Sequence, residues 1–291
     1  MSTSFKGILS MCLGVFFLAL GDAISKWLGE THSPFQIMFF RSLVALPLIA
    51  TLAYFGGGLR KLSTRRPGVH LLRGVIYTGT MGFFILGLTL LPLAEATAIA
   101  FVAPLFVTLL SVPLLGERIA PPVLMASLLG FVGVVIVVRP GAGALGPGAL
   151  SMIAAAMFYA LTMITARRYG ARENLWALLF YVSLIPMLLS ATTLFWVWQT
   201  PQGWQWAGFL ASGVLGVGAI GFITLAFRYA PAAIAAPFDY TALLWAVLLG
   251  WWFWGELPDQ WVWVGSALII ISGLWIAYHD RRTTLKRRPS S

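Results

Sequence analysis

Long apolar stretches alternate with short polar or glycine- and proline-rich connections along the whole chain. Each stretch holds about 18 to 24 residues, the length that an α-helix needs to cross a hydrocarbon core about 30 Å thick. The pattern predicts ten membrane-spanning helices and no separate soluble domain. We place these spans at about residues 8–28, 35–55, 71–91, 93–115, 121–138, 148–166, 175–196, 206–228, 231–254 and 260–278.

The composition is typical of a multi-pass membrane protein. Of 291 residues, 59% are hydrophobic and 10% are charged, which leaves too little polar surface for a water-soluble globule. The net charge of +10 does not indicate nucleic-acid binding, because the basic residues lie in short clusters between apolar stretches. The single cysteine, Cys12, excludes an internal disulfide and a cysteine-based metal site. We expect no metal and no cofactor.

The basic residues are distributed very unequally between the two predicted sides of the membrane. If the N-terminus is cytoplasmic, Arg139 is the one basic residue placed outside, and Lys26 and Arg41 lie within spans; the rest of the 19 Lys and Arg residues are inside. The positive-inside rule then places both termini in the cytoplasm. We expect the protein in the bacterial inner membrane.

An internal repeat relates the two halves of the chain. Residue 92 onward matches residue 231 onward at several positions: Pro92 and Pro231, Gly116-Glu117 and Gly255-Glu256, Ser127 and Ser266. The chain therefore divides into halves at about residues 1–141 and 147–291, each with five spans. Since five is odd, the halves insert in opposite orientations, and inverted repeats are typical of secondary transporters.

The ends of the fourth and ninth spans carry a family resemblance. Each span ends in a short Gly-Glu motif, at Leu114–Glu117 and Trp254–Glu256, and a helix with Gly and Ser follows. This pattern resembles the EamA repeat, and two such repeats in ten spans resemble the drug/metabolite transporter superfamily over essentially the whole chain. The resemblance implies an all-α fold of two inverted five-helix halves around a central cavity. The third and fourth helices of each half, with the first and sixth, would line it.

Members of this superfamily move amino acids, nucleotide sugars, S-adenosylmethionine, riboflavin, organic acids and drugs. The phrase Asp22-x-x-x-Lys26 followed by Gln36 and Arg41 is similar to a bacterial branch with S-adenosylmethionine- or riboflavin-type uptake carriers, and is also found in amino-acid exporters. The resemblance therefore leaves the substrate open.

Five ionisable residues lie within predicted spans: Asp22, Lys26, Arg41, Glu95 and Asp239. A charge inside the membrane costs a few kcal/mol, so it faces a protein interior or a water-filled cavity. Their charges allow at most two ion pairs and leave one carboxylate over. Asp22 and Lys26 share a helix face, and Arg41 should lie at a similar depth. They form either a structural pair with a snorkelling Lys26, or the outer cavity wall, where they bind substrate or latch the outer gate.

Asp239 has the position most indicative of function. It follows Pro237, whose missing amide weakens the helix, and its repeat partner Ala100 carries no charge. Broken helices near the midplane hold substrates and coupling ions in transporters. Burial favours the neutral form of a carboxyl group, so Asp239 is also a candidate for carrying a coupled proton, with Glu95 as the second. A structural hydrogen bond for Asp239 and a helix-dipole charge for Glu95 are the alternatives.

Small and aromatic side chains surround Asp239 in the predicted cavity. The aromatic candidates for substrate contact are Tyr240 and Trp245 on the ninth span, and Tyr77, Phe101, Phe158 and Tyr159 on the other cavity helices. Such a wall suits an amphipathic, partly flat solute. We predict a secondary transporter or exchanger that works by alternating access. Amino acids are the first candidate substrate: Asp239 would hold their ammonium group, and Lys26 or Arg41 would hold their carboxylate. A larger metabolite such as S-adenosylmethionine or riboflavin is the alternative.

Other classes of protein fit the sequence less well. The three histidines, His32, His70 and His279, lie at span ends far apart, so we do not expect a membrane enzyme. No Gly-x-x-x-x-Gly-Lys-Ser/Thr motif for nucleotide hydrolysis is present. A channel would require rings of like charge or carbonyl groups. We expect a monomer whose partners are the lipid bilayer and a small-molecule substrate.

Overall fold

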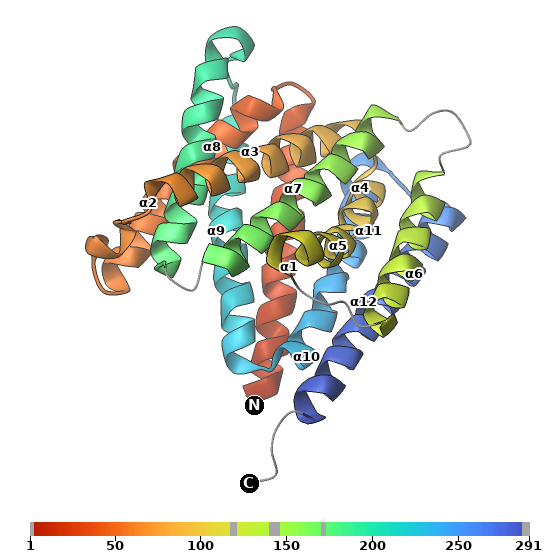
Figure 1. Ribbon diagram of the computed structural model, residues 1–291. Helices are drawn as coiled ribbons and strands as arrows, with labels where there is room; N and C mark the ends of the chain where they lie inside the picture. Colours follow the sequence, from red (N-terminus) through yellow and green to blue (C-terminus); the bar gives the residue numbers. More distant parts are fainter. Residues whose placement is uncertain (1–2, 117–120, 140–145, 170–172, 287–291) are drawn as a thin grey trace.

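The computed structural model describes residues 3–116, 121–139, 146–169 and 173–286, and the described part is helical without strands. The α-helices are α1 (Thr3–Gly29), α2 (Pro34–Phe55), α3 (Pro67–Leu90), α4 (Leu93–Ala100), α5 (Ala103–Leu115), α6 (Pro121–Val138), α7 (Pro147–Tyr169), α8 (Leu175–Val197), α9 (Gln205–Tyr229), α10 (Ala232–Ala235), α11 (Thr241–Trp254) and α12 (Gln260–Lys286). Two 3-10 helices, η1 (Leu59–Leu62) and η3 (Ala236–Tyr240), join them. Figure 1 shows the arrangement.

Every predicted span coincides with a helix or with a broken helix. Eight helices of the described part are long and apolar enough to cross a membrane, if α4 and α5 are counted together as Leu93–Leu115, and the apolar part of α12 is shorter. The ninth predicted span consists of α10, η3 and α11. The all-α membrane fold expected from the sequence is confirmed.

The breaks in the fourth and ninth spans both occur next to prolines. Pro104 lies in the first turn of α5, and Pro237 lies in the first turn of η3. Proline lacks the backbone N–H that would continue the preceding helix, so the chain leaves α-helical geometry for a few residues at each place. The two breaks occur at matching positions of the repeat, since residue 101 corresponds to residue 240.

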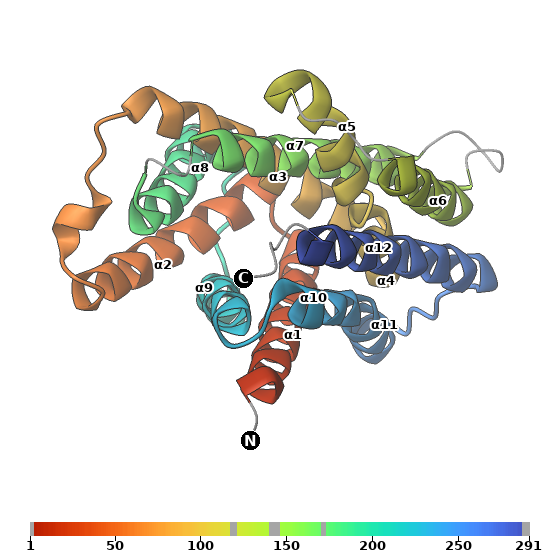
Figure 2. The same ribbon diagram turned by 60° about the horizontal axis from the view of Figure 1, so that its bottom comes forward.

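The pairing of helices is unchanged when the two halves are exchanged. α1 packs on α9 and α3 packs on α7, which are equivalent pairs in the two repeats. α2 packs on α8, and α6 packs on α12, so each of these pairs joins equivalent helices. Figure 2 shows α6 beside α12 at one edge of the molecule and α2 beside α8 at the opposite edge. Two inverted five-helix halves produce this pattern. Glu117, the repeat partner of Glu256, lies outside the described residues.

The two ends of the molecule differ in what they hold. α1 begins and α12 ends at the same end, which we call the near end (Figure 1). The opposite end, the far end, holds the last turn of α1, the linker between α3 and α4, and the last turn of α11. The positive-inside pattern predicts that the near end is cytoplasmic.

Glycines bring α6 and α12 close together. A Cβ atom placed on Gly265 would lie 2.5 Å from the carbonyl oxygen of Gly133, and one placed on Gly133 would lie 2.7 Å from the carbonyl oxygen of Gly265. Small residues at such crossings let helix backbones approach in a membrane, where packing rather than water exclusion holds helices together. This contact fixes the edge of the molecule beside α4 and α11.

Candidate functional site

The two broken spans meet at the centre of the molecule. After α4, the N–H of Val102 bonds to the carbonyl oxygen of Ile99 at 3.0 Å, a tighter turn than that of an α-helix. In the other half, the chain has the same tighter 3-10 geometry in η3, over Ala236–Tyr240. The rings of Phe101 and Tyr240, which are equivalent in the two repeats, pack with centroids 5.0 Å apart. The two helix breaks therefore meet at the pseudo-twofold axis that relates the two repeats.

A cavity of about 280 Å³ lies beside this ring pair. Its wall comes from α1, α3, α4, α5, α7, η3 and α11, which includes residues of both halves. The lining residues that bear a polar group are Asp22, Thr80, Thr97, Tyr159 and Asp239. The remaining lining residues are apolar: Leu18, Ala19, Phe84, Leu93, Ala100, Phe101, Ala103, Pro104, Ala155, Ala156, Ala242 and Ala246. The expected lining by the eighth span is not found, because α9 contributes no residue to this wall.

Asp239 is open to the cavity. Its side chain lies on η3 and is exposed, where the sequence predicted a buried carboxylate. Among the described residues, no hydrogen bond or ion pair is formed by this carboxylate. Tyr159, which lines the same cavity from α7, is 42% exposed. An accessible carboxylate beside aromatic rings can bind an organic cation.

Asp22 lines the same cavity but has a basic partner. Nη1 of Arg41, on α2, lies 3.8 Å from Oδ1 of Asp22. This distance is within ion-pair range and too long for a direct hydrogen bond, and Oδ1 of Asp22 is buried without a hydrogen-bond partner among the described residues. Arg41 itself does not line the cavity. The pair leaves Asp239 as the uncompensated charge of the cavity wall.

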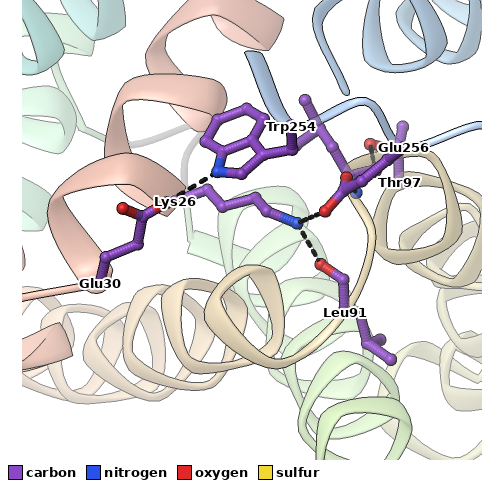
Figure 3. A network of polar contacts seen from close by, with 7 residues as sticks. Lys26, Glu30, Leu91, Thr97, Trp254 and Glu256 are labelled. Atoms are coloured by element: carbon purple, nitrogen blue, oxygen red, sulfur yellow. Dashed lines mark hydrogen bonds and ion pairs between the residues drawn. The ribbon is translucent and has the colours of Figure 1, made fainter. Parts of the chain in front are cut away.

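Lys26 is not part of the cavity wall, in contrast to the sequence-based expectation. Its Nζ donates to Oε1 of Glu256 and to the carbonyl oxygen of Leu91, both at 2.6 Å (Figure 3). The i, i+4 spacing predicted Asp22 as the partner, but a carboxylate 230 residues away takes that place. Glu256 lies just beyond its span and was left out of the expected charge count. Two carboxylates within the spans, Glu95 and Asp239, therefore form no ion pair among the described residues, where one was expected to be left over.

The remaining predicted site residues do not line the cavity. Tyr77 packs on a buried cluster of α1, α2, α3 and α9, and Tyr240 packs against Phe101. Trp245 meets Phe16 edge to face, with ring centroids 4.7 Å apart. Glu95 is half-buried in the first turn of α4. Four of the predicted residues thus share the cavity: Asp22, Phe101, Tyr159 and Asp239.

Sequence reasoning missed most of the apolar wall of the cavity, the lining residues Thr80, Phe84 and Thr97, and one ion-pair partner. Thr80, Phe84 and Thr97 line the cavity, and they have no signal in the sequence because hydroxyl and phenyl groups are common on all faces of membrane helices. Glu256 did have a signal, the Gly-Glu motif at the end of the ninth span. Among the described residues, no group of three His, Cys, Asp or Glu side chains could hold a metal ion.

Comparison with known proteins gives the family. Residues 5–139 and 146–278 each match the EamA-like transporter family. The chain belongs to this family. The EamA-family chain is also similar, with a TM-score of 0.65 and 24% identity, to a protein of known crystal structure; the match covers 97% of this chain and 98% of the other. That likeness supports the fold.

Several relatives of this EamA-family protein are named as transporters. An S-adenosylmethionine uptake transporter of Rickettsia conorii is 30% identical over 100% of this chain and 98% of its own length. A riboflavin transporter of Rhizobium johnstonii is 29% identical over 99% of this chain and 96% of its own length. A pseudopaline exporter of Pseudomonas aeruginosa is 28% identical over 92% of this chain and 94% of its own length. The protein is a multi-pass membrane transporter of a bacterial type.

Proposed function

We propose that this protein carries an amphipathic organic cation with a flat ring system, and that S-adenosylmethionine is the first candidate. The observation that carries the proposal is Asp239, an exposed carboxylate on a broken helix that lines the cavity with Phe101 and Tyr159. S-adenosylmethionine offers a sulfonium and an ammonium group to the carboxylate and a purine ring to the aromatic side chains. The similarity to an S-adenosylmethionine uptake transporter supports this choice.

Amino acids, our first expectation from the sequence, are less well supported. That prediction needed Lys26 or Arg41 to hold a substrate carboxylate in the cavity. Lys26 is bound to Glu256, and Arg41 is engaged with Asp22, so neither cation is free for the α-carboxylate that amino acids and S-adenosylmethionine share. S-adenosylmethionine also offers a sulfonium group to Asp239 and a purine ring to the aromatic side chains, which simple amino acids lack. The named relatives also move larger metabolites. The larger-metabolite alternative is therefore the one we propose.

The transport cycle that we propose is alternating access. The two halves, residues 1–141 and 147–291, would rock about the axis that the Phe101–Tyr240 contact marks. Both termini would lie in the cytoplasm of a bacterial inner membrane, and one chain would contain the whole pathway as a monomer without enzymatic activity. Asp239 is the first candidate for carrying a coupled proton, and Glu95 is the second.

The test is binding and transport by the purified protein in proteoliposomes. Uptake of labelled S-adenosylmethionine is measured in competition with unlabelled riboflavin and amino acids, for the unmodified protein, Asp239→Asn and the charge-conserving Asp239→Glu. A hydrogen bond to a charged group contributes about 1.5–3 kcal/mol. At about 1.4 kcal/mol per factor of ten, Asp239→Asn should weaken binding about 10- to 100-fold, whereas Asp239→Glu should retain most of it.

Two results would contradict the proposal. Equal affinity of the unmodified protein and Asp239→Asn for S-adenosylmethionine would remove Asp239 from the site. Saturable uptake of riboflavin that S-adenosylmethionine does not inhibit would replace the cationic substrate by a neutral flat one.

A further inference from the structure

A small polar network connects the two halves at the far end of the molecule. The ammonium group of Lys26 on α1 binds Oε1 of Glu256 and the carbonyl oxygen of Leu91, and Oε2 of Glu256 accepts the N–H of Leu93 at 2.9 Å (Figure 3). Lys26, Leu91 and Leu93 belong to the first half, and Glu256 belongs to the second. The carboxylate of Glu256 thus ties the end of α11 to the end of α1 and to the start of α4.

This network lies directly on the cavity. Leu93, which donates its amide to Glu256, also lines the cavity. Thr97 lies one turn further along α4 and lines it too (Figure 3). Asp22, another lining residue, lies one helical turn before Lys26. The network therefore closes the cavity at its far end.

The end of α11 is built to present Glu256 at this point. Gly255 has a φ angle of 67°, a left-handed conformation that favours glycine. The turn lets the N–H of Glu256 bond to the carbonyl oxygen of Gly250 at 3.1 Å. A Cβ atom on Gly250 would lie 3.3 Å from Oε2 of Glu256. The backbone geometry, and the absence of a side chain at residue 250, hold the carboxylate against α4.

The network can also come apart without stranding a charge. The side chain of Glu256 is 24% exposed, so water can reach it when it leaves Lys26, whose side chain is 9% exposed. Lys26 then has Asp22 one turn away on the same helix face. Oδ1 of Asp22 faces Arg41 at 3.8 Å but accepts no hydrogen bond among the described residues, so it can accept one from Lys26 while it stays near Arg41. An exchange of Glu256 for Asp22 therefore lets Lys26 keep a counter-ion in both states.

We propose that the Lys26–Glu256 ion pair, with the backbone groups of Leu91 and Leu93, is a latch that keeps the far end closed and opens in each transport cycle. The latch rests on the transporter function and is independent of the identity of the substrate. The positive-inside pattern makes the far end the extracytoplasmic side. Lys26 and Glu256 act here as positioning residues and do not contact the substrate.

Cysteine labelling tests the latch without any substrate. Cys12 is the single cysteine, so Cys12→Ala gives a clean background for Ala100→Cys, which places a reporter in the cavity wall. A membrane-impermeant thiol reagent is then added to right-side-out or inside-out vesicles. Glu256→Gln and Lys26→Met should each speed labelling from the far-end face at least tenfold. They should also slow labelling from the near-end face, because fewer molecules then have a closed far end and an open near end.

A nearby ion pair provides the matched control. Arg139 and Asp259 also join the two halves at the far end, but their side chains are 42% and 44% exposed, and exposed ion pairs contribute little to stability. Asp259→Asn should leave both labelling rates within about twofold of the unmodified protein. The latch would be wrong if Glu256→Gln labels at the unmodified rate, or if Asp259→Asn has the same effect. Faster labelling from both faces would indicate unfolding and would equally overturn it.

Discussion

Removing Arg41 tests the charge assignment of the cavity most directly. Arg41 and Asp22 are 3.8 Å apart, and their side chains are only 14% and 12% exposed. At that distance two unit charges attract by about 4 kcal/mol if the effective dielectric constant is about 20. Loss of one partner of a buried pair typically costs about 3–5 kcal/mol, because the other charge stays behind uncompensated. We expect Arg41→Met to lie near the lower bound, about 3 kcal/mol, since the pair has no direct hydrogen bond.

The assay is a double-mutant cycle. The free energy of unfolding is measured in detergent micelles for Arg41→Met, Asp22→Asn and the double variant. Removing both charges leaves no stranded carboxylate, so the double variant should lose less than the sum of the two single variants, by at least about 1 kcal/mol. Arg41→Met should also bind cationic ligands more tightly than the unmodified protein, because it adds a second uncompensated carboxylate to the cavity.

Additivity of the two single variants within about 0.5 kcal/mol would refute this reasoning. Asp22 would then be an uncompensated carboxylate in the unmodified protein as well. The cavity would hold two such groups, and the special role proposed for Asp239 would be lost.

Two further predictions concern stability. Gly265→Ala should destabilise the protein by about 1–3 kcal/mol through overpacking against Gly133. The control is Gly221→Ala, which has open space around it and should be neutral or stabilising by up to about 1 kcal/mol. Equal melting temperatures of the two variants would contradict the close crossing of α6 and α12. The hydrogen bond with His70 lowers the pKa of Glu173 below its usual value. A carboxyl group whose pKa is lower in the folded than in the unfolded state stabilises the folded state at pH values above its unfolded-state pKa. This stabilisation is lost as the pH falls through the folded-state pKa. Glu173→Gln should therefore melt earlier at pH 7, and the difference should shrink below about pH 4; a gap of constant size would contradict it.

The sequence was sufficient to predict the elements of the fold. The length of the apolar stretches gave the spans, and the prolines at residues 104 and 237 lie where the fourth and ninth helices break. The break after α4 and its match to the break in η3 were not predicted, although the repeat offset that pairs residue 101 with residue 240 contains this correspondence. The spans and the break at Pro237 could be predicted because each depends on residues close together in the chain.

The orientation of side chains around the breaks could not be predicted in the same way. The expected wall near Asp239 used α-helical periodicity, 3.6 residues per turn, for the residues that follow the break at Pro237. η3 has a 3-10 geometry of about three residues per turn, which changes the direction of every side chain that follows. Tyr240 therefore packs on Phe101, and Trp245 packs on Phe16. Periodicity also says nothing about partners distant in the chain, so Lys26 was assigned to Asp22 when its partner is Glu256.

The difference between Ala100 and Asp239, which are equivalent in the two repeats, has a consequence for kinetics. In the proposed alternating-access cycle, two identical inverted halves would give inward- and outward-facing forms that are related by a twofold rotation and therefore have equal energy. Here one half supplies a carboxylate and the other a methyl group to the same cavity, so the two resting forms differ in energy. Such a carrier cannot change the final equilibrium of its solute, but its half-saturation concentrations differ on the two faces of the membrane.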